Sequence, residues 1–192
     1  MPLFYIYADT KNYRLPGFDR EQSRAVFGSD IQNQFDVNFE AKSYATKWQK
    51  LKVNFDCDGA GMNGDLIPDI SEINGRLFLT IKAYNALKQL LDNDGEFLPV
   101  SSAEHGDAWI FNPLSLAEDV DGLDQNLSIK NEWGDIENTA FCEDRVKDFM
   151  IFRSCFDNHR NAFCQAIVKE ATESAGLKGV AFTPDLGKPN LR

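Results

Sequence analysis

The residues best suited to chemistry in this sequence are two histidines, four cysteines and a large set of carboxylates. Cys155 and His159 lie close together in the chain, so a Cys–His dyad is one nucleophilic arrangement that the sequence leaves open. Paired carboxylates are plentiful, but their spacing does not show which of them converge. No Gly-x-Ser-x-Gly, phosphate-binding loop or dinucleotide fingerprint occurs. We therefore predict no catalytic residue, and keep a small hydrolase or transferase with a Cys/His or paired-carboxylate site as the alternative function.

Metal binding is also disfavoured by the residue pattern. No two cysteines form a Cys-x-x-Cys pair, and the scarcity of histidine argues against a zinc site. A glycine-rich acidic segment places Asp56, Asp58 and Gly61 at the first, third and sixth positions of an EF-hand loop. However, Ala60 stands where an oxygen ligand is needed, and Ile67 stands where the bidentate glutamate belongs. We predict a surface turn there, with no metal and no cofactor.

The acidic residues are unevenly distributed along a chain whose formal net charge is -10. The span from Gln89 to Ile129 contains no lysine or arginine, and a second such span runs from Val53 to Gly75. Binding to nucleic acid or to an anionic membrane requires clustered cations and is therefore disfavoured. A basic partner protein would be attracted and steered by such a surface. The simpler interpretation is a solvated acidic face that aids solubility.

Length and hydropathy place the chain among globular proteins. Its 192 residues, 43% of them hydrophobic, suffice for one domain or for a domain with a lobe. No apolar run approaches the ~20 residues that span a bilayer. The apolar N-terminal segment has no preceding lysine or arginine and breaks at Asp9, so it indicates a first strand and not a secretory signal. These features predict a cytoplasmic protein with free thiols.

Two helices are expected to position the rest of the chain. The first follows Thr80, a suitable N-cap, and ends near Asn93. Its apolar stripe consists of Ile81, Tyr84, Leu87, Leu90 and Leu91. The second spans Gln165–Ser174, with Ile167, Ala171 and Ala175 facing inward. A short third helix near Glu21–Phe27 lies within an otherwise loop-like N-terminal stretch.

Short strands account for most of the remaining pattern. The predicted strands are 2–8, Gln49–Phe55, Glu96–Val100, Ala108–Asn112, Leu127–Trp133, Asn138–Cys142, Phe149–Ser154 and Gly179–Phe182. Turn residues separate several of them, notably Gly134–Asp135. Strands interrupted by two main helices predict an α+β fold with a mostly antiparallel sheet.

A series of short segments in the second half resembles one known family in its order and spacing. The segments are Gly95–Val100, Trp109–Asn112, Asp121–Asp124, Met150–Arg153 and Ala175–Phe182. Together they resemble the immunity protein family 11 of bacterial polymorphic toxin systems, formerly described as a domain of unknown function. The resemblance covers residues 64–182, which leaves an N-terminal lobe, residues 1–63, and a flexible tail, residues 183–192. It implies a protein that binds and silences a toxin made by its own cell.

The partner of such a protein is a cognate toxin, and the acidic composition favours a basic one. Because the segments that carry the resemblance consist mainly of scaffold residues, the contact residues must be inferred from charge and exposure. Trp133 lies beside Glu132 and before a turn, which predicts a partly exposed aromatic side chain of the kind that interfaces favour, whereas Trp109 is expected in the core. The predicted toxin-binding residues are Asp92, Asp94, Glu118, Asp119, Asp121, Asp124 and Trp133.

Overall fold

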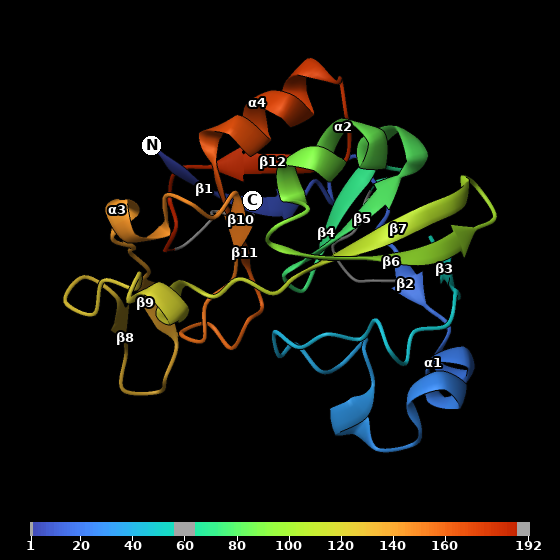
Figure 1. Cartoon of the computed structure of the whole chain (residues 1–192), viewed down its shortest axis with the longest axis horizontal. Helices are drawn as coiled ribbons and strands as arrows, with labels where there is room; N and C mark the ends of the chain where they lie inside the picture. The colour runs from blue at the N-terminus through green and yellow to red at the C-terminus, as the bar shows by residue number, and fades with distance from the viewer. Residues whose placement is uncertain (1, 56–63, 188–192) are drawn as a thin grey trace.

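The computed structural model describes residues 2–55 and 64–187, and it confirms the α+β class with mostly antiparallel sheets (Figure 1). Most of the calcium-like acidic loop, from Asp56 to Asn63, lies outside the described residues. No helix in the described ranges is long and apolar enough to cross a membrane.

A four-stranded sheet joins the two ends of the chain. Its order is β10 (Ile151–Phe152), β11 (Ala162–Gln165), β1 (Leu3–Ala8) and β12 (Val180–Thr183). All neighbouring pairs are antiparallel, and β1 lies between two C-terminal strands. The segment before residue 64 therefore shares this sheet with strands from residues 64–187.

The second main sheet has six strands. Its order is β2 (Gly17–Phe18), β3 (Leu51–Asn54), β6 (Gly95–Ser102), β7 (Gly106–Pro113), β5 (Arg76–Thr80) and β4 (Ile70–Ile73). The pairing is antiparallel except between β3 and β6. Strand β3 alternates buried and exposed residues, as a strand with one solvated face should. Thus the N-terminal segment also contributes to the second sheet.

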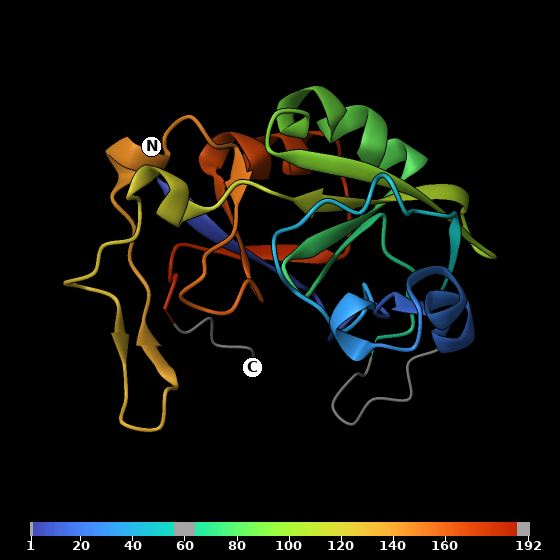
Figure 2. The same cartoon turned by 60° about the horizontal axis from the view of Figure 1, so that its bottom comes forward.

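A small hairpin stands apart from both sheets. Strands β8 (Ile129–Lys130) and β9 (Ile136–Asn138) pair only with each other, and the hairpin projects from the body of the molecule (Figure 2). It follows the 3-10 helix η2 (Ala117–Val120) and precedes the short helix α3 (Glu143–Val146). The predicted strands in this region are longer than the observed ones, and Phe141 makes only an isolated bridge to Leu123.

Helices α2 (Ile81–Leu91) and α4 (Ala166–Ser174) lie on the same side of the sheets and confirm the two main predicted helices (Figure 1). The Thr80 side chain caps α2 by accepting a hydrogen bond from the Ala83 amide. The remaining helices, α1 (Arg20–Phe27) and the 3-10 helix η1 (Ile31–Asn33), lie in the N-terminal segment.

The inward faces of the main helices differ in part from the prediction. Ile81 and Ile167 are 49% and 43% exposed, so their assignment to the core is wrong. In α2 the buried stripe runs through Ala83, Leu87 and Leu91, which are spaced four residues apart. Ile81 lies two residues from that stripe and hence on another face of the helix.

Strands β4, β5 and β11 have no counterpart among the predicted elements. Every residue of β5 and of β11 is buried. A strand buried on both faces lacks the alternation of apolar and polar residues that identifies a half-buried strand.

The first residues of the predicted C-terminal tail belong to the fold. Thr183 lies in β12, and Leu186 packs against a core cluster.

Candidate functional site

Three of the predicted acidic residues converge at one surface depression. Glu118, Asp121 and Asp124 line a hollow of about 380 Å³ together with Leu123 and Cys142. Asp121 ends η2 in the left-handed conformation, with φ 53°. Asp119 is exposed on the same short helix. The structure therefore brings four of the seven predicted residues to a single region.

A close approach of two short helices shapes this depression. Gly122 follows η2, and a Cβ atom there would lie 2.4 Å from Cγ1 of Val146 in α3 and 2.8 Å from the Ala117 carbonyl oxygen. Such distances exclude any larger residue without rearrangement. Gly122 thus lets η2 and α3 pack together and fixes the acidic wall of the hollow.

Glu118 has a structural role in addition to its place in the depression. Its Oε1 accepts hydrogen bonds from the Ser154 hydroxyl at 2.6 Å and from the Phe156 amide at 3.3 Å. Its Oε2 is buried and has no hydrogen-bond partner. Glu118 therefore links η2 to the chain after β10.

The prediction that Asp94 lies on the toxin-binding surface is wrong, because its side chain is buried. It is only 3% exposed, and its carboxylate accepts hydrogen bonds from the Ser115 hydroxyl and from the amides of Met150 and Ile151. Asp94 therefore anchors β10 to the chain between α2 and β6. Asp92, two residues earlier, is exposed at the end of α2 and lies apart from the depression in sequence.

Trp133 is exposed, and more fully than the predicted partial exposure. It lies at the turn of the β8–β9 hairpin with 78% of its surface accessible, and Leu127 and Ile129 of the same hairpin are 56% and 48% exposed. Trp109, in contrast, is partly buried and stacks on Tyr84 with ring centroids 4.1 Å apart. The hairpin therefore adds apolar surface next to the acidic depression.

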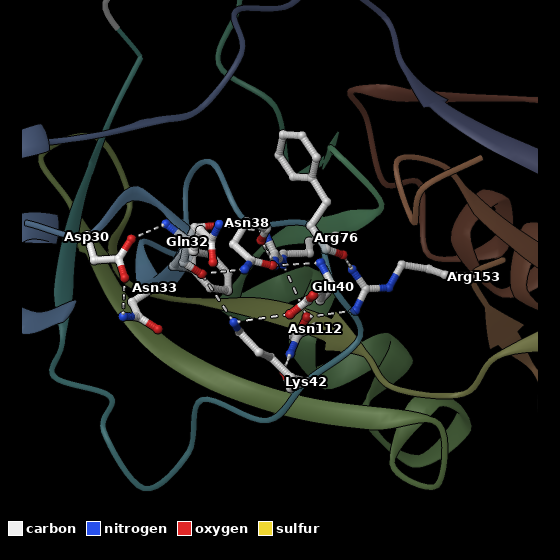
Figure 3. Close-up of polar contacts among 11 residues, drawn as sticks. Asp30, Gln32, Asn33, Asn38, Glu40, Lys42, Arg76, Asn112 and Arg153 are labelled. Carbon is white, nitrogen blue, oxygen red and sulfur yellow. Dashed lines mark hydrogen bonds and ion pairs between the residues drawn. The ribbon is translucent and has the colours of Figure 1, made fainter. Parts of the chain in front are cut away.

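A buried polar network, missed by sequence reasoning, holds the N-terminal segment against the six-stranded sheet. Figure 3 shows Arg76 and Arg153 pointing toward the side chain of Asn112, whose Oδ1 accepts a hydrogen bond from each. Arg76 donates to the Phe35 and Asn38 carbonyls at 2.8 and 2.7 Å. Arg153 likewise donates to the Phe39 carbonyl at 2.9 Å.

Glu96 extends this network toward the chain after Phe39. Its carboxylate accepts hydrogen bonds from the Asn112 amide, the Tyr44 backbone N–H and the Ser43 hydroxyl, all within 2.8 Å. Asn112 also donates to the Lys42 carbonyl at 3.0 Å. Glu96 lies in β6, Asn112 lies in β7, and Arg153 directly follows β10. These elements therefore meet at one network, which fixes residues 35–45 mainly through their backbone.

The two arginines of the network are desolvated and close to each other. Burial lowers the pKa of Arg76 to about 10. Burial, followed by the charge of Arg76, lowers the pKa of Arg153 to about 9. Both stay protonated at neutral pH, and their donors are directed at backbone carbonyls. The geometry indicates a structural role for the pair.

Cys155 and His159 do approach each other, with Cys155 Sγ 3.4 Å from His159 Nε2. Burial, with the nearby charge of Glu118, raises the pKa of the Cys155 thiol. Burial, with the charge of Arg153, lowers the pKa of His159. Both shifts favour a neutral thiol beside a neutral imidazole. This is opposite to the thiolate–imidazolium pair that activates a catalytic cysteine.

Two desolvated carboxylates lie near each other beside β1. Burial raises the pKa of Glu72 to about 8 although part of its side chain reaches the surface, and the charge of Asp157 adds to the shift. Burial raises the pKa of Asp157 to about 6, and nearby amides partly offset this rise without reaching hydrogen-bond geometry.

Within residues 2–55 and 64–187, no group of three His, Cys, Asp or Glu side chains is arranged to hold a metal ion.

Comparison with known proteins adds no relative to this picture. No family model matches the chain, and no curated protein matches it.

Proposed function

We propose that this chain is an immunity protein that binds a cognate bacterial toxin and neutralises it by covering its active or functional surface. The observation that carries the proposal is the acidic depression lined by Glu118, Asp121 and Asp124. The resemblance of the segments from Gly95 to Phe182 to an immunity family supports the same function. The exposed apolar side chains beside the depression add the kind of surface that protein interfaces bury.

The proposed mechanism is electrostatic and steric. The acidic surface of a chain with net charge -10 accelerates encounter with a basic toxin, and the bound chain then excludes the toxin's substrate. A toxin that acts on a phosphate-containing substrate fits this mechanism well, because carboxylates present negative charge to the same cationic cleft. Binding takes place in the cytoplasm of the producing cell, and it requires no cofactor and no catalysis by this chain.

The alternative, a small hydrolase or transferase, is favoured by one contact, the 3.4 Å approach of Cys155 to His159. The directions of the two pKa shifts oppose it. Under the immunity proposal, Cys155→Ser should protect cells from the toxin as well as the wild type does. Loss of protection by a correctly folded Cys155→Ser variant would favour the alternative.

The acidic depression can be tested by charge reversal that spares the structural carboxylate of Glu118. In the test variant, Asp119→Lys is combined with Asp121→Asn, since asparagine tolerates the left-handed backbone at that position. The control variant combines Glu170→Lys with Glu104→Gln, which changes net charge equally at exposed positions of α4 and of the β6–β7 turn.

The test variant should associate with the neighbouring gene's toxin roughly tenfold more slowly at low salt, with a weaker salt dependence, and should protect cells less. The control should behave like the wild type. Association rates measured at two salt concentrations, together with survival of toxin-producing cells, provide the readout. Equal losses in both variants would mean that total charge matters and that the depression is not a contact site. Absence of any binding by the wild-type chain would overturn the proposed function.

A further inference from the structure

The β8–β9 hairpin concentrates exposed apolar surface in a short stretch of chain. Leu127, Ile129 and Trp133 are all about half or more exposed, whereas the other large exposed side chains of the described residues are scattered over several elements. Contiguous exposed apolar surface on a globular protein commonly marks an interaction site. Tryptophan in particular is enriched among the residues that dominate binding energy.

The hairpin turn is held in shape by its own polar side chains. The Asn131 Oδ1 accepts hydrogen bonds from the amides of Trp133 and Asp135, at 3.0 and 2.8 Å. Gly134 adopts a φ of 85°, which only glycine takes without strain, and donates to the Asn131 carbonyl. Trp133 is therefore presented on an ordered turn, so less conformational entropy is lost when it binds a partner.

Polar contacts also fix the base of the hairpin. The Asn138 side-chain amide donates to the Leu127 carbonyl at 2.7 Å. The Asp124 carboxylate accepts from the amides of Asn126 and Leu127. Because Asp124 also lines the acidic depression, the base of the hairpin adjoins the depression.

The charges around the exposed side chains are predominantly negative. Glu132, Asp135 and Glu137 are exposed on the hairpin. Its single lysine, Lys130, has its ammonium 4.6 Å from the centroid of the Phe156 ring, which ties the hairpin to the body. An apolar tip with an acidic rim complements a concave surface with basic walls.

We infer that the hairpin inserts into the basic-walled functional cleft of the toxin, with Trp133 as the principal anchor. The inference rests on the proposed function and names the element that carries binding. The projecting shape of the hairpin fits a concave partner (Figure 2). The acidic depression at its base then faces the rim of the same cleft, so one partner covers both surfaces.

The test uses the full chain and an active-site-inactivated form of the toxin encoded beside its gene. Trp133→Ala should raise the Kd roughly 30-fold or more, mainly through faster dissociation. Asn131→Ala, which loosens the turn but keeps the tryptophan, should give a smaller increase. The matched control is Ile81→Ala, which removes an exposed apolar side chain from α2.

A photocrosslinking residue placed at Trp133 should react with the toxin, and one placed at Ile81 should not. Trp133→Ala and Ile81→Ala should keep the wild-type melting temperature, since these side chains lie outside the core clusters. If the wild type binds and protects but Trp133→Ala binds equally well, or position 133 does not crosslink, the hairpin inference is wrong and the proposed function stands. If the wild-type chain does not bind the toxin, both fail.

Discussion

At the residue scale, the buried carboxylates beside β1 give the protein a specific pH dependence. The pKa of Glu72 rises from its ordinary 4.5 to about 8, mainly through burial, and the pKa of Asp157 rises to about 6. At a pH between the ordinary pKa and the folded-state pKa of such a carboxyl, the folded chain binds more protons than the unfolded chain. The free energy of unfolding therefore falls as pH rises through this window, from about 4.5 to about 8 for Glu72.

Replacing Glu72 with glutamine should remove most of this dependence. The introduced glutamine keeps an oxygen that can accept the Gly75 amide, which now donates to Glu72 Oε1 at 2.6 Å, but it carries no charge to desolvate. We expect the variant to be more stable than the wild type at pH 8 by about 1–3 kcal/mol, and the difference to shrink toward pH 5. Urea denaturation at several pH values measures this. A matched change at the exposed surface, Glu170→Gln, should preserve the wild-type profile. Parallel profiles for wild type and Glu72→Gln would contradict the burial argument.

At the element scale, helix α2 links both sheets to the core. Leu87 and Leu91 are fully buried in a cluster that includes Ile6 of β1 and Leu79 of β5. Helix α4 contributes Val168 to the same cluster. The stability of the fold therefore depends on the face of α2 that carries Leu87, and much less on the face that carries Ile81.

Paired substitutions on α2 test that assignment of faces. Leu87→Ala should lower the free energy of unfolding by about 2–5 kcal/mol through the cavity it leaves, and Leu87→Asp should abolish soluble folding. Ile81→Asp should be tolerated, because Ile81 is half-exposed and an acid in the first turn favours the helix dipole. Soluble yield and thermal melting followed by circular dichroism give the readout. A Leu87→Asp variant that melts like the wild type would refute the core assignment.

At the scale of the whole molecule, the buried network around Asn112 attaches an irregular segment to a regular scaffold. Residues 35–45 contain no helix or strand, and side chains of β5, β6, β7 and the chain after β10 hold them mainly by their backbone groups. Phe35 and Tyr44 add apolar anchors in the second core cluster. Contacts to backbone place little constraint on the exposed side chains of the segment.

Removing Asn112 should release this segment selectively. Asn112→Ala leaves Arg76, Arg153 and Glu96 each without one partner, which should cost about 2–4 kcal/mol. Hydrogen exchange should speed up for the amides of Tyr44 and Ala45, which donate to Glu96.

The control for this experiment is Asn33→Ala, which removes an exposed asparagine from η1 and should change little. In Asn112→Ala, the amides of α2 should exchange no faster than global unfolding of the variant allows. A uniform increase across the chain, with no excess at residues 35–45, would mean that the network stabilises the whole fold and does not specifically hold the segment.

Local sequence patterns determined several elements of this protein. Periodicity and turn residues, which are signals between positions close in sequence, predict α2 with its Thr80 cap. The same kinds of signal predict α4, β1 and the β6–β7 pair. The α+β class follows from the order of these elements. The exposure of Trp133 was also predictable, because a turn and adjacent charged residues are local signals.

Tertiary structure alone decided which polar residues meet. Arg153 reaches the carbonyl of Phe39 across 114 positions of sequence, and Tyr44 reaches Glu96 across 52. Asp94 resembles its exposed neighbour Asp92 in sequence, yet it is buried and accepts hydrogen bonds from the amides of Met150 and Ile151. The uniformly buried strands β5 and β11 carry no alternation that could reveal them. Periodicity records which face of an element is buried, whereas the partner of a buried polar group depends on long-range packing.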